Sequence, residues 1–387
     1  MTAATLIAQV TVPTGVLTGA IVVLVSALMA AVIVTLGYSL RAARTRRRRT
    51  VVRSELRSEL LDRLYGRDDP AWEAWAASLS SREREELESI LGVYLREIEG
   101  RDARRLAGLG TALGIDDRSR EDIATGDYWD RLHALTWLAL LRDAPDRDLL
   151  ETHCRGTPRE RAAAARVLYA SDATDLATTG VDLLLGDRPD AFSVFGIDTL
   201  YRVAEADPSV LFERAAADFD EWDPALQQQV LLATRHLHTV VGGADLSWAV
   251  RAIDSPAERV RVAAWRAIDA YGWNPRIRAG VEFDAIYDDP SPIVRADAYR
   301  LLGAWGDPDA LATLQGAAAA ELDARARVAA ADALFHNRSR TPETPVPDGL
   351  DVAWQWAAEH ARFDALARDV SADRRVATAP AFEGADG

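Results

Sequence analysis

The residues of this 387-residue chain that could bind a metal or act as nucleophiles are six histidines and one cysteine. A metal site needs several ligands at short, regular spacings, such as two histidines one helical turn apart. His236 and His238 lie two residues apart, so on a helix their side chains point to different faces. His153 and Cys154 are neighbours without a CxxC or HxxxH companion. The sequence therefore predicts no metal site, and we interpret these residues as ordinary helix or loop residues.

Motifs for nucleotide binding and acyl transfer are also missing from the sequence. It has no Walker loop, no dinucleotide-binding glycine pattern and no GxSxG. The stretch "GLGTALG", residues 108–114, looks like a phosphate loop, but no strand precedes it and its Leu and Ala content is typical of helix packing. The acidic pairs at 116–117 and 288–289, and "DYWDR" at 127–131, suit turns and helix N-caps. We predict no catalytic residue, no cofactor and no enzymatic activity.

The elements that carry these residues repeat along the chain. One unit, residues 288–314, indicates an Asp-Pro turn, a helix, a "GDP" turn and a second helix. An anchor position recurs at spacings of 32, 32, 38, 30, 34 and 32 residues, namely Tyr128, Glu160, Phe192, Val230, Val260, Val294 and Ala326. Apolar residues follow most anchors at i+3, i+4, i+7 and i+8, which is one face of a helix. No segment alternates with period two, so we predict an all-α chain built as an α-solenoid of helix pairs.

The unit at 288–314 resembles the HEAT-like repeat, in the short form first named for phycobilisome lyases. The matching features are Asp289-Pro290, Val294-Arg295, Ala298, Leu301-Leu302-Gly303 and Gly306-Asp307-Pro308. The resemblance is strong over residues 254–336 and weaker over 126–250, where Val-Arg becomes Glu160-Arg161 or is lost. The whole arrangement is similar to prokaryotic proteins that join one N-terminal transmembrane helix to such repeats.

The resemblance implies a scaffold that binds another protein. It does not specify a reaction, because lyases, adaptors and structural proteins all contain this repeat. The alternative is a lyase-like or maturation enzyme, which requires a polar pocket on the array. A DNA-repair enzyme is a third reading, but residues 58–387 carry a net charge of −22, which repels phosphate. We expect a protein partner, and no nucleic acid.

Several of the eleven tryptophans lie in or beside the repeats. We expect most of them to fill gaps between helices and one or two to anchor a partner.

The first forty residues contain no charged residue or histidine. Residues 15–40 are long and apolar enough to predict a transmembrane helix about 30 Å long or more. A cleaved signal peptide would need basic residues before the apolar run, and here they follow it. A buried core helix is the remaining alternative, which a run of this length disfavours.

An arginine cluster follows the apolar run and comprises Arg41, Arg44, Arg46, Arg47, Arg48 and Arg49. Basic residues flanking a span stay on the cytoplasmic side and also attract anionic lipid headgroups. The sequence therefore predicts a single-pass cell-membrane protein, with its N-terminus outside, its repeat body in the cytoplasm and membrane lipids as partners of these arginines.

The composition suits a reducing environment for the body of the protein and indicates a source organism with a biased amino-acid usage. The net charge is −15, all 45 basic residues are arginine, and one cysteine allows no internal disulfide. The acidic excess without lysine indicates a high-GC or salt-adapted source. The predicted segments are an extracytoplasmic N-terminus (1–14), the transmembrane helix (15–40), a basic juxtamembrane helix (41–66), a charged helical region (67–125), the repeat array (126–337), a Pro-rich linker (338–349), a C-terminal helix (350–370) and a disordered tail (371–387).

Overall fold

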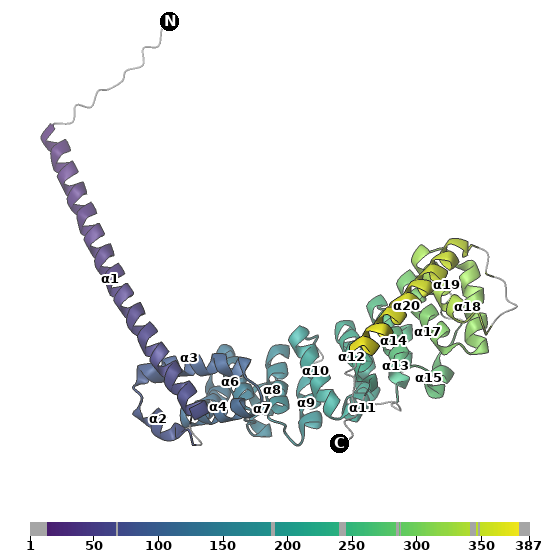
Figure 1. Cartoon of the computed structure of the whole chain (residues 1–387), viewed down its shortest axis with the longest axis horizontal. Helices are drawn as coiled ribbons and strands as arrows, with labels where there is room; N and C mark the ends of the chain where they lie inside the picture. Colours follow the sequence, from purple (N-terminus) through teal and green to yellow (C-terminus); the bar gives the residue numbers. More distant parts are fainter. Residues whose placement is uncertain are drawn as a thin grey trace, which may run out of the picture. The chain divides into compact units, whose positions relative to one another are not determined.

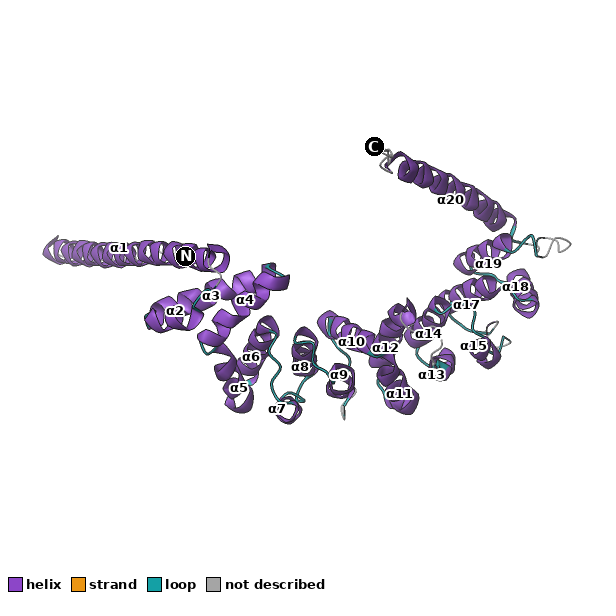
Figure 2. Cartoon of the chain, turned by 60° about the horizontal axis from the view of Figure 1, so that its bottom comes forward, coloured by secondary structure: helices purple, strands orange, loops and turns teal. Residues whose placement is uncertain are grey.

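A computed structural model describes residues 14–66, 69–186, 190–239, 245–283, 286, 288–340, 346 and 349–378. The chain divides into two compact units, Met1–Asp116 and Asp117–Gly387, which we describe separately. Every regular element in the described part is helical, with no strand, as Figure 2 shows. The predicted all-α class is confirmed.

The first unit begins with α1 (Thr14–Gly66), one helix of 53 residues (Figure 1). No helix in the described part of the chain combines the length and the apolar character that crossing a bilayer needs. This finding contradicts the transmembrane helix predicted at 15–40, and with it the single-pass localisation with the N-terminus outside. The apolar run does not form an element of its own, because the same helix continues through the arginine-rich residues to Gly66.

The remainder of the first unit is a small helical cluster around the C-terminal part of α1. It contains α2 (Trp72–Ser78), α3 (Ser81–Glu97) and α4 (Gly100–Ala112), with α1 packed on α3 and α2 and α3 packed on α4. Leu56, Leu60 and Leu64 recur every four residues on α1 and are buried. The predicted capping box at the start of α3 is confirmed, since Ser80 and Glu83 bond reciprocally to each other's backbone N–H.

After α5 (Ile115–Thr125), the second unit is built from helix pairs, whose first and second members we call A and B helices. The A helices are α6 (Tyr128–Leu141), α8 (Pro158–Ala170), α10 (Val194–Ala206), α12 (Pro224–His236), α14 (Glu258–Ala270), α17 (Pro292–Trp305) and α19 (Ala324–His336). The B helices are α7 (Arg147–His153), α9 (Leu176–Leu185), α11 (Pro208–Asp218), α13 (Ser247–Arg251), α15 (Pro275–Gly280) and α18 (Pro308–Ala320).

Each A helix packs on the next A helix, from α6 through to α19, and α20 (Asp351–Thr378) packs on α19 (Figure 2). This is the predicted α-solenoid. Three short 3-10 turns lie between helices, at Phe219–Glu221, Leu237–Thr239 and Ala252–Asp254. Residues 371–378 of the tail predicted to be disordered belong to α20, and residues 1–13 and 379–387 lie outside the described residues.

Proline residues and aspartate N-caps mark where many helices of the second unit begin. Proline occupies the first turn of α8, α11, α12, α15, α17 and α18, where its missing N–H costs nothing. Side chains of Asp207, Asp223, Asp307 and Asp323 accept from backbone N–H groups of the helices that follow them. The N-cap role predicted within residues 127–131 is confirmed, because Asp127 accepts from the Trp129 and Asp130 N–H groups at the start of α6.

The predicted anchor keeps its place in only four of the seven A helices. Glu160, Val260, Val294 and Ala326 are each the third residue of their helix. Phe192, by contrast, lies two residues before α10. The longest spacing, 38 residues, ends in α12, whose start carries no Val-Arg pair to fix the register.

Candidate functional site

A row of arginines joins one repeat to the next in the second unit. Arginine is the fourth residue of five A helices, namely Arg131 (α6), Arg161 (α8), Arg261 (α14), Arg295 (α17) and Arg327 (α19). We call these the clamp arginines. Four of them donate a hydrogen bond to a carbonyl five or six residues earlier, in the loop before their own helix.

Three clamp arginines also reach a carboxylate of the following repeat. Arg261 forms two hydrogen bonds with Asp289, at 2.7 and 3.1 Å, and Arg295 forms two with Glu321, at 2.8 and 2.9 Å. Arg131 pairs with the buried Glu160 at 2.8 Å. A guanidinium fits a carboxylate in this bidentate way better than any other side chain. Arg131, Arg261 and Arg295 therefore link successive repeats.

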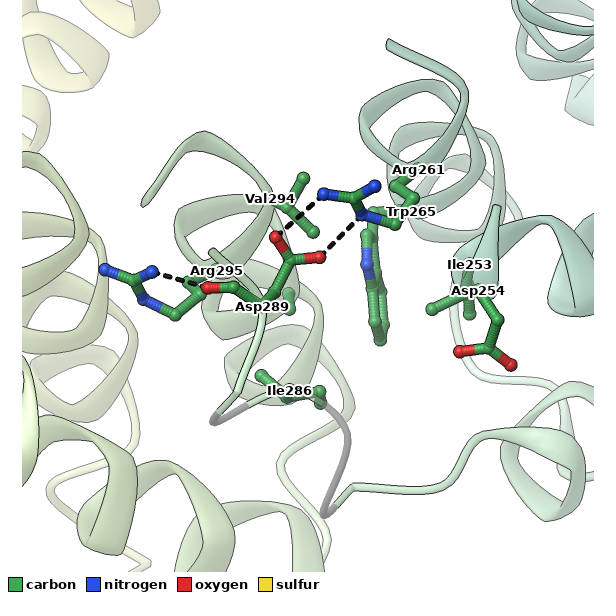
Figure 3. Close-up of a pocket in the computed structure, with 9 residues that line it drawn as sticks. Ile253, Asp254, Arg261, Trp265, Ile286, Asp289, Val294 and Arg295 are labelled. Carbon is green, nitrogen blue, oxygen red and sulfur yellow. Dashed lines mark hydrogen bonds and ion pairs between the residues drawn. The ribbon is translucent and has the colours of Figure 1, made fainter. Parts of the chain in front are cut away.

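Figure 3 shows the clearest part of this arrangement. Arg261 faces the carboxylate of Asp289, while Arg295 donates through Nη1 to the Asp289 carbonyl at 2.6 Å. One aspartate thus receives hydrogen bonds from clamp arginines of two successive A helices. The Val-Arg pairs of the sequence mark these positions, but their partners lie 28 and 26 residues away and no local pattern reveals them.

Glu321 is the most strongly perturbed carboxylate of the clamps. Burial raises its pKa, but hydrogen bonds from Arg295, from the Asp323 N–H and from the Tyr299 hydroxyl outweigh burial and bring the pKa to about 2. The carboxylate is therefore ionised across the physiological range and holds α17 to the loop before α19.

A second row of arginines occupies the ninth position of four A helices, at Arg166, Arg202, Arg266 and Arg300. Two aspartates lie between members of this row. Asp198 accepts from Arg166 at 2.7 Å and from Arg202 at 3.0 Å. Asp297, the polar residue in an otherwise apolar slot, accepts from Arg266 at 2.8 Å and also from Arg300.

Aromatic rings surround the first two of these arginines. Arg166 lies over the rings of Phe195 and Tyr169, each about 5.6 Å from the ring centre, and Arg202 lies over Tyr169 at 5.5 Å. Two turns earlier on the same face of α8, Arg159 lies 5.9 Å from the exposed Trp129 ring of α6. We call these six residues the arginine–aromatic surface: Trp129, Arg159, Arg166, Tyr169, Phe195 and Arg202.

The tryptophans of the repeats fall into the two expected groups. Five are buried between helices, namely Trp137, Trp222, Trp248, Trp265 and Trp305. Trp129 and Trp273 are exposed. The indole N–H groups of the buried Trp248 and Trp265 have no hydrogen-bond partner among the described residues.

The described residues of the second half of the array line a small and a larger cavity. One of about 130 Å³ is walled by Trp265 and the clamp residues Arg261, Asp289 and Arg295 (Figure 3). With its polar groups largely committed to the clamps, this cavity suits ordered water better than a ligand. The other, of about 370 Å³, lies beside α13 and α15 and has the size of a small ligand pocket.

The residues that could do chemistry are not brought together. Within the described residues, no three His, Cys, Asp or Glu side chains gather as metal ligands do. Cys154 is buried, and burial raises the pKa of its thiol to about 12, so the thiol stays protonated at neutral pH. His236 and His238 contact different tyrosines, Tyr201 and Tyr271.

The predicted arginine cluster lies within α1. Arg41 is exposed. The side chains of Arg44, Arg46, Arg47, Arg48 and Arg49 lie outside the described residues, so their contact with lipid headgroups stays a prediction.

Comparison with known protein families gives a match within the second unit. Residues 283–357, which include α17, α18 and α19, match the family described as HEAT repeats. No curated protein and no solved structure matches the chain. Together with the A-on-A packing of the second unit, this match supports a HEAT-like repeat protein, as the sequence indicated. HEAT repeats generally mediate protein–protein contacts.

Proposed function

We propose that this chain is a protein-interaction scaffold and that its second unit binds a protein partner through the arginine–aromatic surface. The repeats are, on this proposal, of the short phycobilisome-lyase type, which the Val-Arg pairs at 260–261 and 294–295 support. The proposal assigns binding to the array and no reaction.

The composition of the surface is the observation that carries the proposal. Trp, Tyr and Arg are the residues that contribute most to binding energy at protein interfaces. On this surface arginines lie against aromatic rings, so their side chains are held in place before a partner arrives and lose less freedom on binding. Val194 and Phe195 are exposed at the start of α10, where nothing in the described structure covers them.

Charge on the surface favours a partner that presents carboxylates. The chain is acidic, with a net charge of −15. Arg166 and Arg202 share the single carboxylate of Asp198, and Arg159 has no ion pair with any described residue. Carboxylates of a partner could therefore pair with these guanidinium groups, while its apolar side chains cover Phe195 and Trp129.

The test is affinity purification of the tagged full chain from its source cells after chemical crosslinking, followed by mass spectrometry. Phe195→Ser and Trp129→Ser are expected to reduce recovery of a specific partner by about tenfold, the effect of losing an interface hot spot. Val352→Ser, which removes an exposed apolar side chain from α20, is the control. Partner recovery that is unchanged in both variants would refute the proposed surface, and the absence of any specific partner would refute the scaffold.

A further inference from the structure

The cavity of about 370 Å³ beside α13 and α15 has no part in the arginine clamps or in the arginine–aromatic surface. Its lining comes from α13, from α15 and from the two residues before α13. The lining residues are Asp245, Leu246, Ser247, Val250, Arg251, Arg276, Ile277 and Gly280. Pockets that hold small ligands typically have volumes of about 300–1,000 Å³ and combine apolar walls with a few polar groups.

Apolar residues form part of the wall, and arginines are its cationic groups. Leu246 and Ile277 are buried, with Val250 half-buried beside them. Arg251 and Arg276 are exposed. Such a lining fits a ligand that has both an apolar part and an anionic group.

The two arginines are available to a ligand. Arg251 contacts Asp220 at 3.2 Å, but both side chains are half exposed or more, and an ion pair of this kind contributes little. The guanidinium of Arg276 forms no hydrogen bond or ion pair with any residue that the structure describes; only its backbone N–H is bonded, to Asn274.

Asp245 is the one carboxylate of the lining, and it is already occupied. It accepts from the Ser247 N–H at 3.0 Å. This bond, the Ser247 hydroxyl and the positive charges of Arg276 and Arg251 together lower the pKa of Asp245. The lining therefore contains two guanidinium groups against one committed carboxylate, which favours an anion over a cation.

We propose that this cavity binds an apolar carboxylate, with the carboxyl group on Arg276 and Arg251 and the aliphatic part on Leu246 and Ile277. The same chemistry is offered by the C-terminal residue of a protein that ends in an aliphatic side chain and by a small free aliphatic acid. The site does not depend on the scaffold function proposed above.

Isothermal titration calorimetry on the full chain distinguishes the two sources. The probes are 4-methylpentanoate and the peptide N-acetyl-Ala-Ala-Leu with a free carboxyl terminus, each compared with its amide. At least one acid is expected to bind about tenfold more tightly than its amide, because the charge-assisted hydrogen bonds are lost in the amide. Binding of the peptide acid alone assigns a protein C terminus, and binding of 4-methylpentanoate alone assigns a small acid.

Variants locate the binding in this cavity. Arg276→Gln is expected to weaken binding of the acid about tenfold, while Arg259→Gln, at an exposed arginine of α14 outside the lining, leaves it unchanged. A Cβ added at Gly280 would lie 3.4 Å from Val250, so the larger side chain of Gly280→Leu is expected to fill the cavity and abolish binding. Asp245→Asn keeps a side-chain oxygen that can accept from the Ser247 N–H but removes a negative charge, so the acid is expected to bind more tightly.

Three results would overturn the proposal. The first is that each acid binds no more tightly than its amide, and the second is that neither acid shows saturable binding. The third is that Arg276→Gln binds the acid as tightly as the wild type while its thermal unfolding also matches the wild type. A fourth result, weaker binding of the acid by Asp245→Asn, would also contradict an anionic ligand, because it would show that the ligand depends on the negative charge of Asp245. None of these results bears on capture of a protein partner, so the two proposals fail separately.

Discussion

At the scale of single residues, the array is held together by arginines that bridge repeats. Arg295 contacts three groups at once: the Asp289 carbonyl and both oxygens of Glu321. The Glu321 side chain is only 2% exposed, so its charge depends on that partner. Arg295 is thus structural, because it joins α17 to the loop before α19.

Removal of one clamp arginine should therefore destabilise the array strongly. Arg295→Met leaves Glu321 as a buried, uncompensated charge and is expected to lower the free energy of unfolding by about 3 kcal/mol or more. Arg325→Gln is the control, because Arg325 is exposed and its side chain forms no hydrogen bond or ion pair with any described residue. This substitution should change the free energy of unfolding by less than about 0.5 kcal/mol. Urea unfolding measures both, and equal effects of the two substitutions would contradict the clamp.

The low pKa of Glu321 makes a pH prediction with a definite sign. Its pKa falls from 4.5 to about 2 on folding, so the stabilisation is fully present above pH 4.5 and is lost as the pH falls from 4.5 towards 2. Glu321→Gln has no such group and should lose less stability over that window. Urea midpoints at pH 5 and pH 3 give the comparison, and parallel losses in both proteins would show that Glu321 is not the group responsible.

The sequence located the clamp positions without revealing what they do. Val260-Arg261 and Val294-Arg295 stand out as repeat signatures, but a local pattern cannot pair Arg295 with a carboxylate 26 residues later. Asp297 is a polar residue in an otherwise apolar slot of the repeat, and in the structure it is buried and held by Arg266 and Arg300. Such pairings join successive repeats and depend on how the helices stack, which no pattern within a single helix shows.

At the scale of elements, close packing of A helices depends on residues without bulk. Gly303 on α17 faces α19, and a Cβ built at Gly303 would lie 2.5 Å from the Cβ of Ala333. Many of the residues along this interface are alanines, as the sequence suggested. The helices can therefore approach closely only while these positions stay small.

Enlarging this contact should cost stability even though alanine favours helix more than glycine does. Gly303→Ala is expected to lower the free energy of unfolding by about 1–3 kcal/mol through overpacking. Gly108→Ala in α4, whose added Cβ would only touch the Trp72 ring at 3.5 Å, is expected to be neutral or to stabilise by up to about 1 kcal/mol. Thermal unfolding monitored by circular dichroism tests both, and stabilisation by Gly303→Ala would contradict the packing described.

Helix type and repeat period were predictable, whereas boundaries and environment were less so. The Pro and Asp residues before the repeats correctly mark helix starts such as Pro158 and Pro224. The apolar N-terminal run was interpreted as a separate membrane-spanning element, and α1 instead continues from Thr14 to Gly66. Hydropathy alone does not show where a helix ends when no proline, glycine or cap interrupts it.

At the scale of the whole molecule, the acidic chain carries partly exposed arginines on the A helices of its second unit. Several aspartates of the repeats serve as helix caps, and the clamp carboxylates pair with arginines. The arginine–aromatic surface is the feature of α6, α8 and α10 on which we focus. A solenoid needs no catalytic cluster to be useful, because stacked helix pairs present an extended surface for a partner. The scaffold proposal rests on that surface.

Site-specific photocrosslinking tests this claim most directly. Phe195 is replaced by the photoreactive residue p-benzoylphenylalanine in the full chain, and Ala217, which is exposed on the B helix α11, is replaced in the same way as a control. After irradiation in the source cells, the account predicts a crosslink to one specific protein from position 195 and none to that protein from position 217. A partner that crosslinks only from position 217, or equally from both positions, would contradict the arginine–aromatic surface as the binding site.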